Sequence, residues 1–433
     1  MIYDKASLVQ IPSGYKSGTL YNVLPNDADG DFDFTRGSTA TRVDENGLIE
    51  TIATGTPRLN YPLLDGVVQD NPTLLLEPQR TNLFNYSEEF SNSVWAKTRT
   101  NITSNVAVSP DGTQNADELS LNSDNDRHYF LQDSTTTNQE YTQTIFIKDN
   151  GARYFQITGS TGFASYWVNF DVQEGVITRN NDNVDATIEN YGNNWYRIGV
   201  TLISSGTTQS RIIFAIINEP FADRLPSFTG VSSESFYIWG AQFEAGSYPT
   251  SYIPSLTGSQ TTRSVDVARG AGTAADFNDS EGVLYANIAA IDDAETNNRR
   301  LGLTKNNTFE GLRIQYNGST IGAVLYDGST NQYSQSFTFS KLSLFAKVAF
   351  KYKASDFALW INGFEYGAQA SGTTLPNGTL DDLSFDYVNG NFFFAKTKEI
   401  GVYDAVLTDA ELEALTSYTS FTNMANELNL TIK

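Results

Sequence analysis

The stretch Phe236–Pro254, FYIWGAQFEAGSYPTSYIP, decides how the rest of the chain is interpreted. Its first half alternates between two kinds of side chain, which is the two-residue period of a strand with two unlike faces. Gly240 interrupts this strand, as glycine does at a bulge or a close backbone approach. Pro249 and Pro254 then end any regular ladder. We therefore expect this stretch to be the last strand of one β-sandwich and the exit from it, with a separate body following.

The composition favours an all-β protein with more than one domain. A chain of 433 residues is too long for one ordinary core. Aromatic residues make up 13% of it, mostly Tyr and Phe, and this favours strands over helices. Cysteine is absent, which excludes disulfide and thiolate chemistry. The one histidine, His128, has polar neighbours, so we expect it on the surface or in a loop, although a Ser-His-Asp site assembled in space stays open.

The net charge of −22 bears on possible partners. An acidic surface repels phosphate backbones, so we expect no nucleic-acid partner. The first ten residues lack a basic stretch followed by an apolar core, so we expect no secretory signal. No run approaches the roughly 18 apolar residues of a membrane helix, so we expect no membrane insertion.

Turn and strand signals divide the chain into five parts. Residues 1–72 are turn-rich and poor in large apolar side chains, so we expect them to lie against another domain or subunit. Residues 73–263 and 281–420 repeat strands and turns about every ten residues, as sandwiches and jelly rolls do. Residues 264–280, rich in Ala, Gly and Asp, are interpreted as a linker, and residues 421–433 as a polar C-terminal tail.

Three shorter patterns make local predictions. The apolar run Leu74-Leu-Leu76 predicts a short buried strand at the start of the first sandwich. Thr408-Asp-Ala-Glu411 is a capping box, which predicts a short helix over 409–416. Apolar residues alternate in the tail, which predicts a lone strand added to a neighbour's sheet, at Leu428, Leu430 and Ile432.

Several segments of the first 265 residues resemble a known class of proteins. They are YDKASLVQIP (3–12), GDFDFTRGSTATRVDENGLIE (30–50), LLLEPQRTNLFNYS (74–87) and the stretch 238–263. These resemble tailed-bacteriophage virion proteins, namely fibre, spike and head-decoration proteins. The resemblance implies a protein carried on the particle, often a homotrimer, with carbohydrate-binding-like sandwiches. It also implies that the N-terminal segment attaches to a portal, tail or capsid protein.

The C-terminal half carries a second resemblance. The segments KVAFKY (347–352), FALWING (357–363) and EIGVYDAVLTDAEL (399–412) resemble laminin-G and concanavalin-A-like lectin domains. This implies a lectin-like sandwich over residues 281–420. Because such domains often hold calcium, it also implies calcium as a cofactor to be considered.

Two acidic groups are calcium candidates. Asp27, Asp29 and Asp31 have the oxygen density that calcium prefers, although the spacing is not that of an EF-hand loop. Asp292 and Asp293 lie in a predicted loop of the second sandwich. A solvated acidic turn is the simpler interpretation of the first group.

Exposed aromatic rings are the natural partners of sugar rings. Trp195, Trp239 and Trp360 lie inside apolar strands, so we expect them to pack in cores. The candidates for stacking on a sugar are instead Trp95, Trp167, Tyr326 and Tyr333.

These patterns leave three hypotheses for function. The first is a non-enzymatic phage virion protein, assembled in the host cytoplasm, that presents lectin-like domains to host-surface glycans. Shallow sites of this kind bind weakly alone and gain strength from copy number. The second is a tailspike depolymerase, although no local pattern selects a carboxylate pair or a nucleophile elbow. The third is a bacterial surface lectin or adhesin.

Overall fold

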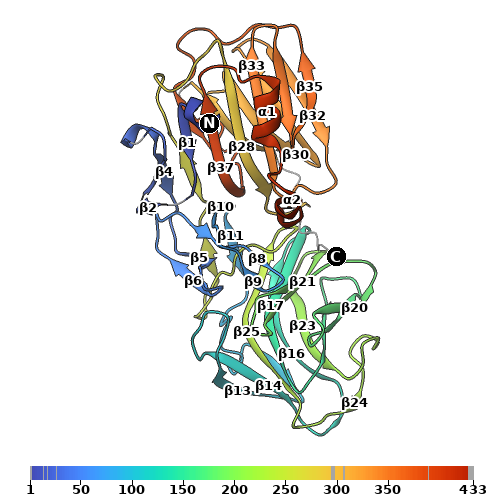
Figure 1. Ribbon diagram of the computed structural model, residues 1–433. Coiled ribbons are helices and arrows are strands. Elements are labelled where there is room, and N and C mark those ends of the chain that lie inside the picture. Colours follow the sequence, from blue (N-terminus) through green and yellow to red (C-terminus); the bar gives the residue numbers. More distant parts are fainter. Residues whose placement is uncertain are drawn as a thin grey trace.

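The computed structural model describes residues 2–12, 14–16, 18–25, 27–293, 298–305, 308–388 and 390–427. The strands pair in antiparallel fashion into several sheets, which confirms the expected all-β class. Figure 1 shows two lobes stacked end to end. The lower lobe holds the middle of the chain, the upper lobe holds its C-terminal half, and the N-terminal segment runs along one side of both.

The lower lobe is a sandwich of two six-stranded sheets. In sheet order, the first contains β12 (Ala96–Thr98), β16 (His128–Thr136), β23 (Thr207–Ile217), β18 (Tyr154–Ser160), β19 (Trp167–Asp171) and β20 (Val176–Asn181). The second contains β13 (Thr100–Ala107), β14 (Ala116–Leu121), β25 (Ser235–Ala245), β17 (Glu140–Asn150), β22 (Tyr196–Ile203) and β21 (Asp185–Asn190). Their inner faces share one core, in which the rings of Phe155 and Phe236 meet at 5.4 Å.

The stretch that organises the sequence forms β25 at the centre of its sheet. It pairs with β14 on one side and β17 on the other. The register with β17 shifts where Ile145 faces both Gly240 and Ala241, and Gly240 has φ of 59°. This confirms the predicted bulge, because a left-handed backbone at that position favours glycine.

The upper lobe is a second sandwich. Its larger sheet contains, in order, β35 (Phe364–Gln369), β34 (Phe357–Ile361), β33 (Ala346–Lys353), β28 (Glu281–Ala290), β37 (Ala395–Tyr403), β10 (Thr73–Leu76) and β7 (Leu59–Asn60), with β1 (Leu8–Gln10) also on β37. The facing sheet contains β32 (Asn331–Thr338), β31 (Thr320–Tyr326), β30 (Gly311–Asn317), β29 (Arg299–Thr304) and β36 (Asp382–Ser384). Tyr333 and Phe350 join the two layers at 4.9 Å.

The N-terminal segment completes the upper sandwich, which local patterns did not reveal. β1 pairs with residues 400–402 of β37, and β10 continues along the same edge at residues 395–397. The strand at 74–76 was expected to open the lower sandwich, and that expectation was wrong. Leu74 and Leu76 are buried in the core of the upper lobe, so this strand packs its apolar side chains there and not in the lower sandwich.

The remaining strands form short pairs along the side of the lobes. One small sheet has four strands, in the order β2 (Tyr15–Lys16), β3 (Thr19–Leu20), β4 (Phe32–Thr35) and β27 (Val267–Arg269). The others are two-stranded: β5 (Ala40–Val43) with β6 (Ile49–Ile52), β8 (Leu63–Leu64) with β9 (Val67–Val68), β11 (Arg80–Asn82) with β26 (Thr261–Arg263), and β15 (Asn125–Asp126) with β24 (Phe228–Thr229). The stretch 264–280, interpreted as a linker, therefore contributes a strand to a sheet with β4.

Helices are few. Two 3-10 turns, η1 (Ile2–Lys5) and η2 (Ala28–Gly30), lie in the N-terminal segment. α1 (Asp409–Thr416) has the predicted capping box between Thr408 and Glu411, and it covers the outer face of the larger upper sheet through Leu412. α2 (Phe421–Glu427) occupies part of the expected tail, while the strand predicted at 428–432 lies outside the described residues. None of the helices described has the length and apolarity to cross a membrane.

Candidate functional site

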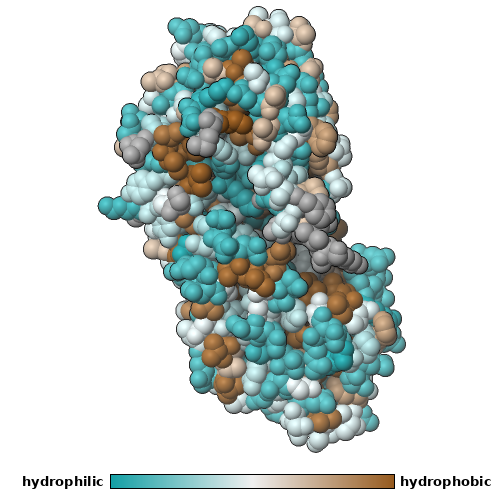
Figure 2. All heavy atoms as spheres, viewed as in Figure 1, coloured by the Kyte–Doolittle hydropathy of each residue, from teal (hydrophilic) through white to brown (hydrophobic). Residues whose placement is uncertain are grey.

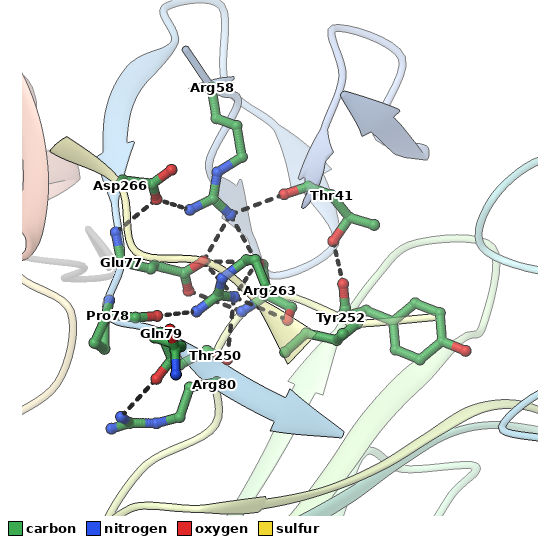
Figure 3. A network of polar contacts seen from close by, with 12 residues as sticks. Thr41, Arg58, Glu77, Pro78, Gln79, Arg80, Thr250, Tyr252, Arg263 and Asp266 are labelled. Atoms are coloured by element: carbon green, nitrogen blue, oxygen red, sulfur yellow. Dashed lines mark hydrogen bonds and ion pairs between the residues drawn. The ribbon is translucent and has the colours of Figure 1, made fainter. Parts of the chain in front are cut away.

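A buried ionic network lies where the two lobes and the N-terminal segment meet (Figure 3). Arg58 Nη1 lies 2.6 Å from Glu77 Oε2, and its Nη2 pairs with the Asp266 carboxylate. Arg263 Nη1 lies 2.8 Å from the same Glu77 oxygen, and Arg36 Nη1 lies 3.1 Å from Asp266 Oδ1. All five residues are at most 2% exposed. The network therefore links segments that are distant in sequence.

Electrostatics hold Glu77 charged in this network. Burial opposes its ionisation, but the guanidinium groups of Arg263 and Arg58 and two hydrogen bonds from Ser251 outweigh burial. The pKa of Glu77 is therefore held well below its usual range. Three arginines face two carboxylates here, so the network carries more positive than negative charge.

A cleft of about 530 Å³ opens beside this network, between the lobes. The N-terminal segment supplies one wall through β5, β7 and β8, the lower lobe supplies another through β21 and β22, and Lys396 of β37 reaches in from the upper lobe. Glu77 lines the cleft, so the ionic network lies directly behind its wall. Figure 2 shows hydrophobic surface on both sides of the waist between the lobes, over the β8–β9 hairpin and near β21.

Four tyrosines line this cleft: Tyr61, Tyr191, Tyr196 and Tyr252. Tyr61 and Tyr196 are half-buried, and their hydroxyls form no hydrogen bond within the part of the chain described. Tyr191 is fixed from behind by an edge contact with Phe146 at 4.9 Å, and burial raises its pKa to about 12. Rings with one face packed and a polar tip in water are suited to binding sugars.

Amide groups flank the tyrosines. Asn60 Oδ1 accepts a hydrogen bond from the Val43 amide at 2.9 Å, which fixes the side chain and leaves its Nδ2 amide without a partner among the described residues. Asn190 Oδ1 accepts from the Gly192 amide at 2.9 Å, and its Nδ2 donates to Asp65 at 3.3 Å. These amides are therefore oriented before any ligand arrives.

A glycine lets one of the tyrosines into place. A Cβ atom on Gly175 would lie 2.5 Å from the ring of Tyr196, and Gly175 has φ of 64°. Both the space and the backbone conformation therefore require glycine at this turn. Its position just before β20 sets the ring at the mouth of the cleft.

Two cations in the cleft lack a carboxylate partner. Lys396 is half-buried, and its Nζ has neither a hydrogen bond nor an ion pair within the described chain. Burial lowers the pKa of Lys396, an effect that Glu189, Asp292 and other acids at longer range only partly offset. Arg197, which is 4% exposed, donates to the Thr250 carbonyl and the Thr144 hydroxyl and also interacts with the Tyr191 hydroxyl, and none of these groups is a carboxylate.

The aromatic residues predicted to stack on sugars lie elsewhere. Trp95 is fully buried between Phe84 and Phe90, and Tyr333 is 1% exposed with its hydroxyl bonded to the Gly367 carbonyl. Rings with no exposed face cannot stack on a ligand, so burial rules out this role for both. The sequence failed to reveal the enclosure of Trp95 because its enclosure is completed by Phe130 and Phe214, which come from β16 and β23.

The other two candidates stay partly accessible but do not meet. Trp167 on β19 is half-buried, with the Arg179 guanidinium 5.0 Å from its ring centre. Tyr326, at the end of β31, is half-buried and donates to the Gly328 carbonyl. Neither lines the cleft. As expected, Trp195, Trp239 and Trp360 are buried.

The aspartates predicted to bind calcium accept hydrogen bonds from nearby loops and do not converge on a common metal position. Asp27 caps η2 by accepting from the Asp29 amide, and Asp31 accepts from the Asn22 amide at 2.7 Å. Asp293, next to Asp292, accepts from two backbone amides and one hydroxyl, at residues 342 and 343. Within the described ranges, no group of three or more His, Cys, Asp or Glu side chains is placed to hold a metal.

His128 was expected on the surface, and this was wrong. It is 1% exposed on β16, and its two ring nitrogens lie 2.9 and 3.2 Å from the carbonyl oxygens of Arg99 and Phe228. Neither nitrogen is available to activate a serine. Alternation along β16 places this side chain inward, and polar neighbours in sequence did not reveal that.

Two carboxyl groups with raised pKa share a separate hollow of about 360 Å³ in the lower lobe. Burial raises the pKa of Glu88 to about 7 and that of Asp117 to about 6. Glu88 accepts from Tyr252 and Asn115, while Asp117 accepts from the amides of Phe90 and Asn105. All four carboxylate oxygens are thus engaged in holding neighbouring segments.

Comparison with known proteins yields partial likeness only. No protein-family model matches the chain, and no curated protein matches its sequence. The CBM40 module of the Ruminococcus gnavus IT-sialidase, bound to α2,3-sialyllactose, is 17% identical over 32% of this chain and 84% of the module, with a TM-score of 0.28. The Trypanosoma rangeli sialidase with sialic acid is 12% identical over 73% of this chain and 62% of the sialidase, with a TM-score of 0.26.

Domains LG4-5 of the mouse laminin α1 chain are 7% identical over 66% of this chain and 87% of theirs, with a TM-score of 0.21. Scores this low assign no ligand, activity or family to this chain.

Proposed function

We propose that this chain is a non-enzymatic glycan-binding protein of a tailed-bacteriophage particle, and that it binds host-surface glycans in the cleft between its lobes. The observation that carries the binding proposal is the lining of the cleft. It combines the half-buried rings of Tyr61 and Tyr196 with the oriented amides of Asn60 and Asn190. Rings for the apolar faces of a sugar and amides for its hydroxyls are the groups that sugar recognition needs.

The rigidity of the site supports binding. The wall behind the cleft is the buried ionic network, and β10, which leads into Glu77, is a strand of the upper sheet. A cleft whose walls are fixed before binding loses less conformational entropy when a ligand enters. This favours recognition by a preformed surface.

The virion assignment rests on the sequence resemblance described above. It includes attachment to a portal, tail or capsid protein through the N-terminal segment, and assembly as a homotrimer. In this chain the N-terminal segment is joined to the upper lobe by β1 and β10, so attachment would use its outward surface. That surface exposes apolar side chains, including Tyr21 and Val23, at 40% and 45%.

We also propose that the chain binds glycans without cleaving them. A depolymerase would need a carboxylate pair with free oxygens beside the bound sugar. Burial also raises the pKa of Glu399, which accepts from the Tyr285 hydroxyl. Neither this acid nor Glu88 and Asp117, whose oxygens are engaged, lines the inter-lobe cleft. We therefore expect no sugar release from host polysaccharide, including by a preparation that binds it strongly.

A binding assay beside a release assay tests the proposal. Purified full-length chain is incubated with host cells and with extracted surface polysaccharide, and bound protein and new reducing ends are both measured. We expect binding without release, and loss of binding in Asn60→Ala but not in the matched surface variant Asn193→Ala. Release that disappears in Glu88→Gln would establish the depolymerase instead. Labelling of purified particles by antibodies to this chain tests the virion assignment.

A further inference from the structure

The wall of the cleft contains more buried positive charge than negative charge. Four arginines at or directly behind the wall are at most 4% exposed, namely Arg36, Arg58, Arg197 and Arg263, and three acids are equally buried, namely Glu77, Asp266 and Glu244. Glu244 also lies 3.8 Å from the partly exposed Arg80. Positive charge therefore exceeds negative charge among these buried groups.

This imbalance is unfavourable for the protein alone. Burial and the neighbouring Arg58 and Arg263 lower the pKa of Arg36, and burial lowers that of Arg263 despite its contact with Glu77, whereas Asp266 and Glu77 raise the pKa of Arg58 in spite of its burial. A charge enclosed in protein costs free energy unless an opposite charge accompanies it. In a chain with a net charge of −22, acids were abundant, yet none pairs with Arg197 or Lys396 among the described residues.

Lys396 projects the same sign of charge into the cleft. It lies opposite Leu75 in the pairing of β37 with β10, and its Nζ has no partner within the described chain. It also lines the adjoining groove of about 360 Å³, where Lys398 lies two residues further along the same face of the strand. The two lysines place positive charge along the seam between the lobes.

The acids around the cleft do not cancel this charge. Asp65, Glu174 and Glu189 line it, but all three are exposed at its rim. Exposed charges are screened by water and salt, whereas enclosed ones are screened much less. Glu174 also pairs with Arg153 at 3.4 Å. The rim is therefore acidic, whereas Arg197 and Lys396 line the interior beside Glu77 and the other buried arginines lie behind its wall.

We infer that the cleft binds an anionic sugar, with Lys396 Nζ as the group that contacts its acidic substituent and the buried arginines as the field behind it. This inference rests on the proposed function and narrows it to a class of glycan, namely uronic acids and other sugars with an acidic group. The tyrosines and amides contact the ring, and the lysine distinguishes an acidic sugar from its neutral counterpart.

Matched pairs of glycans test this inference. Full-length protein is applied to a microbial glycan array that includes glucuronic-acid glycans with their glucose counterparts, and phosphorylated glycans with their unphosphorylated forms. We expect acidic members to bind at least tenfold more tightly than neutral ones. Lys396→Gln should lower acidic binding about ten- to a hundredfold, because one hydrogen bond between charged groups is lost. The neutral members should change little.

Two further variants control the result. Lys353→Gln removes the same charge from an exposed lysine paired with Glu281, and should bind as the wild type does. Lys396→Arg keeps the charge and should retain the preference for acidic members. Equal binding of acidic and neutral members, or unchanged binding by Lys396→Gln, would overturn the inference while leaving glycan binding intact. Absence of binding to every glycan would overturn both.

Discussion

Removing the charge of Glu77 should destabilise the whole molecule. Its carboxylate accepts from Arg58 Nη1 at 2.6 Å, from the Ser251 amide at 2.8 Å and from the Ser251 hydroxyl at 2.6 Å, and it lies 2.8 Å from Arg263 Nη1. Glu77→Gln keeps the shape but leaves Asp266 alone against three buried arginines. Breaking a buried pair by neutralising one partner costs about 3–5 kcal/mol, so we expect the free energy of unfolding to fall by about that amount.

Urea unfolding followed by tryptophan fluorescence measures this effect. Glu50→Gln is the control, because Glu50 pairs with Arg42 at 2.9 Å but is 46% exposed, and such pairs contribute at most about 1 kcal/mol. If Glu77→Gln lost no more stability than Glu50→Gln, the network would not be what holds the segments together. The cleft wall would then need another explanation.

Three more predictions follow from particular contacts. Tyr196→Ala should weaken glycan binding up to about tenfold by removing a stacking face, and equal loss in Phe221→Ala, which is exposed outside the cleft, would contradict this. Burial raises the pKa of Glu88 from 4.5 to about 7, so the unfolded chain loses this proton at lower pH than the folded chain does. The free energy of unfolding should therefore fall by up to about 3 kcal/mol as the pH rises from 4.5 to 7. A pH series in which Glu88→Gln shows the same decline would refute this assignment. Thr408→Ala should cost about 1 kcal/mol by removing the cap of α1, and no change in the unfolding midpoint would show that the cap contributes nothing.

Local chemistry allowed much of the fold to be predicted. Alternation in residues 236–245 and the bulge at Gly240 follow from the pleat and from left-handed backbone geometry. The helix at 409–416 follows from its capping box. The placement of residues 74–76 could not be predicted, because their partners lie more than 300 residues away, at 395–397. A buried apolar strand carries no signal that selects which sheet it joins.

The site was missed for a related reason. Its lining comes from residues as distant as Asn60, Tyr196 and Lys396, and no motif joins them. The candidates drawn from single aromatic positions included Trp95 and Tyr333, whose enclosure is completed by rings from distant strands, Phe214 and Phe350 respectively. One available signal was the charge of Glu77, which directly follows the apolar run Leu74–Leu76.

The most direct test of glycan binding in the cleft is a structure of the full-length chain with the glycan that binds it most strongly on the array. We predict ligand density between the lobes, with the sugar ring against Tyr61 or Tyr196 and its acidic group within hydrogen-bonding distance of Lys396 Nζ. Density on an outer face, such as beside Trp167, with the cleft empty would contradict the account.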